Sequence, residues 1–189
     1  MTKANESLPN TPLAEALSVL GIGPKDWDWL IVSDGSGTTW QQSAGWCGVL
    51  LHRHSFRRHV FSGSLSYGTN NLAEILGVAH PLWYLGDQER QPRWQKVRVL
   101  TDSQYVASSI NTPRQRPKAH AALWHTIWTA QRQLLRVSAT WIRRDTLSLN
   151  QLADAVAGES SRRQRGAAAA AAERLRPGSR GPSGFNPAD

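Results

Sequence analysis

The sequence predicts an α/β domain built on a mixed sheet that has an antiparallel part. Three strand-like segments precede the first helix-like segment, and helices then alternate with strands. The chain has 189 residues, 40% of them hydrophobic, with nine tryptophans, which favours a folded domain with a sizeable core.

The antiparallel part is predicted from three short apolar segments separated by turn residues. They read WLIVSDGSG, GWCGVLLH and RHVFSGSLS, and begin at residues 29, 45 and 58. A helix is expected next in TNNLAEILGVA, at 69–79. Pro81 is expected to end or kink this helix near Ala79, because proline lacks a backbone N–H and clashes with the preceding turn.

The second half of the domain alternates between the two element types. KVRVLTDSQYV, from residue 96, predicts a strand that ends at Asp102, followed by a short helix near 103–110. Apolar side chains at near-helical spacing predict a further helix around residues 123–134. VSATWIRR, from residue 137, is the last predicted strand, and NQLADAVAG, from residue 150, begins the last helix.

Two end segments flank the predicted domain at 27–158. Residues 1–26 form an N-terminal extension in which PLAEALSVLGIGP predicts a short helix that caps the domain edge or docks a partner. Residues 159–189 form a low-complexity Arg/Ala/Gly/Pro tail that is expected to be disordered, although its six consecutive alanines are able to extend the last helix as far as Arg176. The tail either adds non-specific affinity for phosphates or serves only solubility.

Charge and cysteine content narrow the class of protein. Lys and Arg number 22 against 14 Asp and Glu, a net charge of +8, which favours nucleic acid as a partner ahead of an anionic membrane. A single cysteine excludes an intrachain disulfide and a cysteine-based zinc site. We expect a cytoplasmic protein with no membrane partner, because no signal core and no 18-residue apolar run occur.

Four of the eight acids in 27–157 have an unusual placement. Asp34 and Asp102 directly follow buried strands, and ligand sites of α/β sheets favour these strand ends. Glu74 and Asp154 lie in apolar helices, where a carboxylate is costly to bury unless something compensates its charge. The alternative interpretations are a solvent-facing Glu74 and a helix-capping Asp102.

A convergence of these four carboxylates predicts a metal centre. Their mutual repulsion would raise their pKa values and destabilise the fold unless cations bind between them. Carboxylate oxygens are hard ligands that suit Mg²⁺ or Mn²⁺ far better than Zn²⁺. Four acids also match the two-metal arrangement used in phosphoryl transfer.

Four segments, in chain order, resemble the signature segments of type 1 ribonuclease H. They are SDGSG, TNNLAE, TDSQYV and NQLADAVA, and the resemblance spans about residues 29–158. It implies the five-stranded mixed sheet of that family, with three antiparallel and two parallel strands flanked by helices. It also implies Mg²⁺-dependent endonucleolytic hydrolysis of the RNA strand of an RNA–DNA hybrid by two metal ions, with Mn²⁺ able to substitute.

The resemblance also assigns site residues and a partner. The metal-binding and catalytic positions are Asp34, Glu74, Asp102 and Asp154, and the substrate-binding positions are Ser36, Thr69, Asn70, Asn71 and Gln104. Polar side chains suit this second role because a 2′-hydroxyl both donates and accepts hydrogen bonds. Asn70 or Asn71 has the alternative role of capping the helix. The expected partner is an RNA–DNA hybrid, and the expected state is a monomer.

The sequence departs from the family pattern in three places, one of which is the first loop, DGSGTTWQQSAGWCG, where the commoner family version carries Pro and more Gly. No histidine lies between Trp141 and Asp154, where the family usually has one that assists proton transfer or product release, and Asp145 is either a substitute acid or an ordinary loop residue. The segment NTPRQRPKAH is too short for the basic handle of some members. Its own basic residues supply a reduced grip, or the C-terminal arginines compensate.

These departures leave two other functions open. One is a non-catalytic nucleic-acid-binding module that keeps the fold. Retention of all four acids opposes it, because a pure binder gains nothing from a negative cluster that faces phosphates. The other is a related nuclease that acts on another substrate, such as branched DNA.

Overall fold

A five-stranded mixed sheet forms the centre of the structure, a computed structural model that describes residues 12–37, 43–88, 92–112 and 117–174. The strand order is β3-β2-β1-β4-β5, with antiparallel β1/β2 and β2/β3 pairs and parallel β1/β4 and β4/β5 pairs. The predicted mixed sheet is therefore confirmed. The strands are β1 (Trp29–Ser36), β2 (Ala44–His52), β3 (Arg58–Leu65), β4 (Lys96–Thr101) and β5 (Arg136–Trp141).

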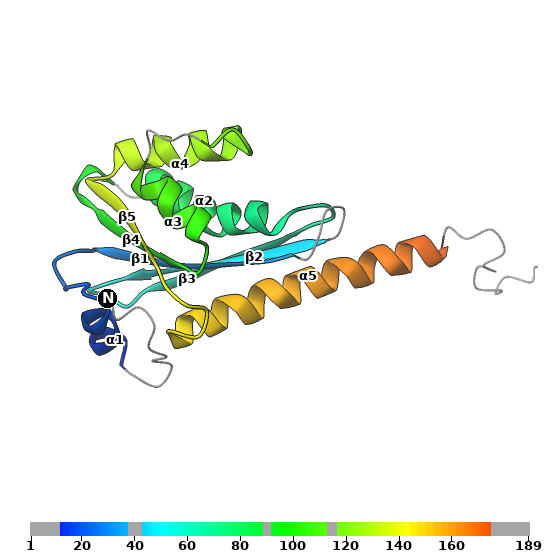
Figure 1. The fold of residues 1–189 in the computed structure, drawn as a ribbon, viewed down its shortest axis with the longest axis horizontal. Coiled ribbons are helices and arrows are strands. Elements are labelled where there is room, and N and C mark those ends of the chain that lie inside the picture. The colour runs from blue at the N-terminus through cyan, green and yellow to red at the C-terminus, as the bar shows by residue number, and fades with distance from the viewer. Residues whose placement is uncertain (1–11, 38–42, 89–91, 113–116, 175–189) are drawn as a thin grey trace, which may run out of the picture.

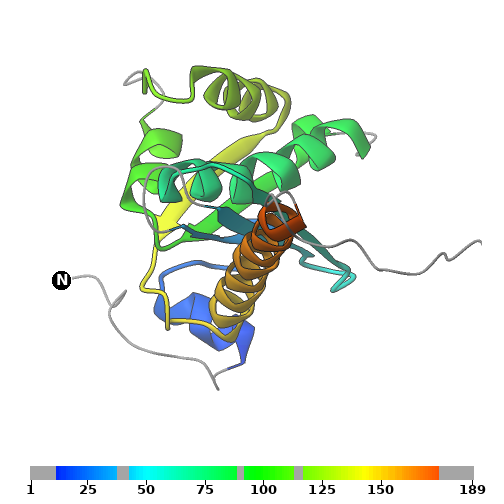
Figure 2. The same ribbon diagram turned by 90° about the vertical axis from the view of Figure 1, so that its right-hand side faces the viewer.

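Helices cover both faces of this sheet (Figures 1 and 2). Three of them lie on one face, and the other two lie on the opposite face. In the part of the chain that the structure describes, no helix is long and apolar enough to cross a membrane. The first face carries α2 (Asn70–Gln88), α3 (Gln104–Asn111) and α4 (Ala121–Gln133), the second carries α1 (Leu13–Val19) and α5 (Ser148–Arg174), and a 3-10 turn, η1 (Pro92–Trp94), precedes β4.

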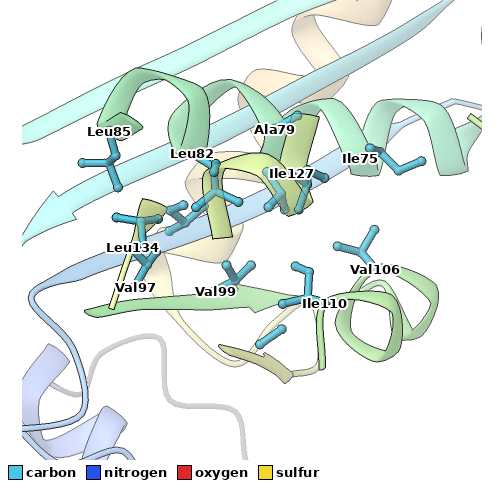
Figure 3. Close-up of a cluster of buried hydrophobic side chains, with 14 of the residues drawn as sticks. Ile75, Ala79, Leu82, Leu85, Val97, Val99, Val106, Ile110, Ile127 and Leu134 are labelled. Atoms are coloured by element: carbon cyan, nitrogen blue, oxygen red, sulfur yellow. The ribbon is translucent and has the colours of Figure 1, made fainter. Parts of the chain in front are cut away.

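The alternation of side chains along β1 supplies both cores. Ile31 faces α2, α3 and α4, whereas Leu30 and Val32 face α1 and α5. A strand buried on both faces must be apolar throughout, which explains the continuous apolar run that ends at Asp34. Figure 3 shows the first core, where side chains of α2, α3 and α4 meet those of β4.

Helix α2 continues through Pro81 to Gln88, so of the two expected outcomes, an end or a kink near Ala79, the end is wrong. Proline costs about 3 kcal/mol in a helix interior. The turns beyond it bury Leu82 and Leu85 completely in the first core. Each such burial is worth roughly 1.5–3 kcal/mol, so packing offsets the local cost.

Helix α5 also runs farther than the predicted domain. It crosses the expected boundary at 158/159 and ends at Arg174, so the alanine-rich segment is helical, and residues 175–189 lie outside the described residues. Ser161 is buried against the start of β2, where its hydroxyl donates to the Ser43 carbonyl at 3.1 Å and the Ser43 hydroxyl donates to the Ser161 carbonyl at 3.2 Å. The first turns of the predicted tail are therefore part of the packed domain.

A glycine in β2 permits this contact. A Cβ atom on Gly45 would lie 2.0 Å from the Ala157 carbonyl oxygen and 2.6 Å from the Ser161 nitrogen. Both neighbours are backbone atoms of α5, so no side-chain movement would relieve the clash. Gly45 therefore sets how closely α5 approaches the sheet.

We expect Gly45→Ala to destabilise the fold by about 1–3 kcal/mol, as overpacking does. That corresponds to a loss of roughly 2–10 °C in Tm for a chain of this size, measured by thermal denaturation. Gly166→Ala is the matched control, because a Cβ on Gly166 meets no atom within 4 Å and alanine favours a helix by up to about 1 kcal/mol. Equal Tm values for Gly45→Ala and the wild type would show that α5 does not depend on this contact.

Candidate active site

Two of the predicted acids lie side by side because their strands are parallel neighbours. Ser33 of β1 pairs with Thr101 of β4, and Asp34 and Asp102 are the residues that follow. The Asp34 side chain is 1% exposed and that of Asp102 is 14% exposed. The carboxyl ends of the two strands thus bring two carboxylates to one edge of the sheet.

Glu74 reaches the same place from α2. The helix crosses β1 at Gly35, where a Cβ would lie 2.6 Å from the Glu74 nitrogen, so only glycine allows this approach. Glu74 is 2% exposed, which excludes the alternative of a solvent-facing residue. One carboxylate oxygen from each of Asp34, Glu74 and Asp102 lies within 4.8 Å of the other two.

Asp154 lies at the rim of this trio. It is in the second turn of α5, and its side chain is 43% exposed. Among the described residues, the group close enough to share a metal ion consists of the other three acids. Asp154 is linked to them through Arg144, which it meets at 3.5 Å.

Burial raises the pKa values of the two innermost carboxyl groups. The pKa of Glu74 rises to about 9 and that of Asp34 to about 7, first through loss of hydration and then through the negative charge of Asp102. Among the described residues, both Asp34 oxygens, Oε2 of Glu74 and Oδ1 of Asp102 have no hydrogen-bond partner. Buried oxygens without donors are costly unless a cation binds them.

Arg144 points its guanidinium group at this cluster. Its Nε lies 3.0 Å from Oδ2 of Asp102, and its Nη2 lies 3.9 Å from Oδ1 of Asp34. The loop that carries it is held to β4, because Trp141 Nε1 donates to the Asp102 carbonyl at 2.9 Å and the Ile142 amide donates to the Thr101 carbonyl at 3.0 Å. Arg144 thus places one positive charge against three of the four predicted acids.

Arg144 is not among the site residues predicted from the sequence. The available signal was an arginine pair directly after the last strand, at the same sheet edge as the acids. Asp145, and not Arg144, stands near the position of the family histidine. In the structure, Asp145 meets Arg143 at 3.3 Å, and Arg144 is the residue directed at the carboxylates.

The trio fits a divalent cation on chemical grounds. It offers hard carboxylate oxygens, several of them without other partners, to one point in space. Mg²⁺ and Mn²⁺ favour such oxygen donors. Asp34, Glu74 and Asp102 are therefore the residues that would hold a metal, with Asp154 beside them.

The predicted substrate residues at the start of α2 have distinct contacts. Thr69 caps the helix, since its hydroxyl accepts from the Leu72 amide at 3.2 Å, so neither Asn70 nor Asn71 is the cap. Asn70 accepts from the Gly37 amide at 3.1 Å through Oδ1 and donates to Glu74 Oε1 at 3.4 Å through Nδ2. Asn70 therefore ties Glu74 to the chain that follows β1.

The remaining predicted residues lie at the same edge of the sheet. Ser36 is half-buried at the end of β1, while Asn71 and Gln104 are exposed in the first turns of α2 and α3. Ser103 caps α3 by accepting from the Val106 amide at 3.3 Å, so the alternative of Asp102 as the cap is wrong. Arg114 and Arg116 lie outside the described residues.

The raised pKa values predict a metal-free protein that is less stable in alkali. A carboxyl group with a raised folded-state pKa contributes most stability below its ordinary value, 3.8 for Asp34 and 4.5 for Glu74, and loses it as the pH rises through about 7 and about 9. We therefore expect Tm in EDTA to fall between about pH 5 and pH 9. Glu74→Gln should flatten this fall and raise Tm at pH 9 by roughly 2–10 °C, since an unpaired buried group costs on the order of 1–3 kcal/mol.

Glu15→Gln is the control for this measurement, because Glu15 is an exposed carboxylate on α1. It should leave the pH dependence unchanged. If Glu74→Gln and Glu15→Gln give the same profile as the wild type, Glu74 is not a buried charge in solution.

The position of Arg144 predicts that its guanidinium group competes with a metal ion for the carboxylates. Without metal, Arg144→Met should lower the free energy of unfolding slightly, by about 1 kcal/mol or less for a side chain that is 56% exposed, and thermal denaturation measures this loss. Mn²⁺ should bind roughly 10-fold more tightly to the variant, since repulsion between the guanidinium and the ion is removed. Isothermal titration calorimetry measures this affinity.

Arg143→Met is the matched control, because the neighbouring Arg143 pairs with Asp145. It should leave Mn²⁺ affinity near the wild-type value. Weaker Mn²⁺ binding by Arg144→Met would mean that Arg144 supports the ion instead of competing with it.

Solved structures of known proteins share this fold over most of the chain. The N-terminal RNase H domain of a Mycobacterium tuberculosis protein is 22% identical, with a TM-score of 0.63 over 75% of this chain and 99% of that one. The compost-derived LC11 RNase H1 is 18% identical, with a TM-score of 0.61 over 71% and 97% of the two chains. RNase H1 of Halobacterium salinarum is 19% identical, with a TM-score of 0.56 over 70% and 96%.

These identities are low and show the fold alone. Comparison with curated proteins finds no match. The sequence model of the RNase H family, in contrast, matches residues 27–162, which include β1 to β5 and all four predicted acids. The chain belongs to the RNase H family.

Proposed function

We propose that this protein is an endoribonuclease that hydrolyses the RNA strand of RNA–DNA hybrids with two divalent ions, Mg²⁺ or Mn²⁺. The observation that carries the proposal is the convergence of three carboxylates where α2 meets the ends of β1 and β4; two of them are buried, and each has at least one oxygen without a hydrogen-bond partner among the described residues. A domain that only bound nucleic acid would gain nothing from this arrangement, because buried like charges destabilise the fold and repel phosphates.

The assignment of metal ligands follows from the same geometry. Asp34, Glu74 and Asp102 would hold the ions, and Asp154 completes the set of four carboxylates. When bound, such ions supply a water nucleophile of lowered pKa and stabilise charge on the leaving oxygen. Asn70 orients Glu74 for this role through its hydrogen bond to Oε1.

Polar side chains around the carboxylates suit recognition of the RNA strand. Ser36, Asn71 and Gln104 lie at the carboxylate edge of the sheet. Such groups distinguish RNA from DNA by hydrogen bonds to 2′-hydroxyls. Two structures of similar fold, those of LC11 RNase H1 and of a foamy viral protease-reverse transcriptase, are complexes with RNA/DNA hybrids, which supports this class of substrate.

Arg144 contributes charge and not a proton. The sequence between Trp141 and Asp154 has no histidine for proton transfer, and a guanidinium group stays protonated near neutral pH. Ions bound to the carboxylates would displace Arg144 by charge repulsion, and its exposed guanidinium would then be available to an anionic substrate. We assign it the role of pairing with a substrate phosphate.

Cleavage assays on several nucleic acids test the proposed function. With Mg²⁺ or Mn²⁺, the protein should cut the RNA strand of a hybrid and leave 5′-phosphate and 3′-hydroxyl ends. Asp102→Asn should lower the rate by at least roughly 100-fold, because it removes a ligand charge from the centre that stabilises the transition state.

Asp145→Asn is the matched control, since it removes a carboxylate from the β5–α5 loop outside the trio. Intact hybrids in both metals would contradict the proposal and leave a binding module. Faster cutting of four-way junctions or duplex DNA would instead indicate a nuclease with another substrate.

A further inference from the structure

The last helix continues well beyond the carboxylate that it contributes. Figure 1 shows α5 lying along one face of the sheet and extending past its end. It is anchored to the sheet as far as Gln164, which accepts from the Ser64 hydroxyl at 3.1 Å and donates to the Ser66 hydroxyl at 2.9 Å. Side chains on this stretch of α5 therefore have fixed positions relative to the active site.

One side of α5 runs along the helix from the carboxylate centre, and we call it the flank. At 3.6 residues per turn, Asp154, Gly158 and Arg165 lie within an arc of roughly 40°, and Arg162 lies roughly 40° farther round. A Cβ on Gly158 would be 3.4 Å from Arg162 Nη1 and 4.0 Å from the Ser36 hydroxyl oxygen. The Arg162 side chain thus folds back over Gly158 toward the end of β1.

The flank carries the guanidinium groups of Arg162 and Arg165, which can bind a phosphate. Arg162 Nη2 meets Glu159 Oε2 at 3.1 Å, but such an exposed pair is worth only about 0–1 kcal/mol and exchanges easily for a phosphate. Among the described residues, no carboxylate pairs with Arg165. Arg165 is therefore available to an anionic polymer beside the active site, and Arg162 is available once a phosphate replaces Glu159 as its partner.

We propose that Arg162 and Arg165 form a phosphate-binding flank that holds the backbone of an RNA–DNA hybrid next to the carboxylate centre. This inference rests on the proposed function and assigns it a substrate-binding surface on α5. Measured along the helix from Asp154, Arg162 lies about 12 Å away and Arg165 about 16 Å away. These spacings correspond to roughly 3–5 base pairs of duplex at 3.4 Å per pair.

A salt titration of hybrid binding tests the flank. The Asp102→Asn background prevents cleavage, and fluorescence anisotropy reports binding of a labelled 20-base-pair hybrid in Mg²⁺. Arg162→Gln with Arg165→Gln should weaken binding roughly 10- to 60-fold at 0.1 M salt and should reduce the slope of log K against log salt by about 2, one for each lost phosphate contact.

Arg163→Gln is the matched control. Arg163 shares the same Glu159 partner, at 2.8 Å, but lies roughly 160° round the helix from Arg165. It should leave the slope unchanged. Equal losses in Arg163→Gln and the double variant would overturn the proposal, because they would indicate a diffuse charge effect instead of a defined surface.

Kinetics separate this inference from the proposed function. With Asp102 intact, the double variant should raise KM for hybrid cleavage roughly 10-fold or more and leave kcat near the wild-type value. An unchanged KM and salt slope in an enzyme that cuts hybrids would overturn the flank alone. A wild-type protein that cuts no hybrid would overturn the proposed function, and the binding titration would still decide whether Arg162 and Arg165 contact phosphates.

Discussion

The close approach of α2 to β1 at Gly35 brings three carboxylates together, and the rest of the structure has to compensate their repulsion. Burial of Asp34 and Glu74 beside Asp102 opposes folding, since their pKa values rise and three of their four carboxylate oxygens have no hydrogen-bond partner among the described residues. The packing of the cores supplies the compensation. Gly35 allows the helix backbone to reach the strand, and the apolar residues after Glu74 bury α2 against the sheet. A cation that bound there would relieve this unfavourable electrostatic energy, so metal binding would raise the stability of the fold.

Much of the fold and three of the site residues were predictable from the chain itself. Acids that directly follow apolar strands come together whenever those strands are parallel neighbours, and an acid inside an apolar helix has few other places to go. The fate of Pro81 was not predictable, because the local cost of proline is offset by burial of Leu82 and Leu85, which depends on tertiary packing. The exposed position of Asp154 also depends on packing, since it follows from how α5 lies on β2.

Arg144 illustrates a second limit of sequence patterns. A pattern identifies which acids need a counter-charge, but the chain can provide that charge from any loop that ends at the same sheet edge. Here two hydrogen bonds from the end of β5 to β4 direct the loop so that Arg144, and not Arg143 or Asp145, meets the carboxylates. Arg144 thereby places a positive charge beside the buried acids, which lowers the cost of their burial, while its own side chain stays 56% exposed.

The same helix contact positions both the proposed metal centre and the proposed phosphate-binding flank. Gly45 sets the approach of α5 to β2, and this one contact positions both Asp154 and the flank of Arg162 and Arg165. A slip of α5 by one turn would move both features together by about 5.4 Å. The distance between the carboxylate and the arginines would not change, because they share one rigid element, whereas both would lose their register with Asp34 and Ser36 on β1. Hydrogen bonds from Ser161 and Gln164 to the sheet oppose such a slip. The extension of α5 thus holds Arg162 and Arg165 at fixed distances from Asp154. Packing between backbone atoms of α5 and β2 fixes the helix against the sheet.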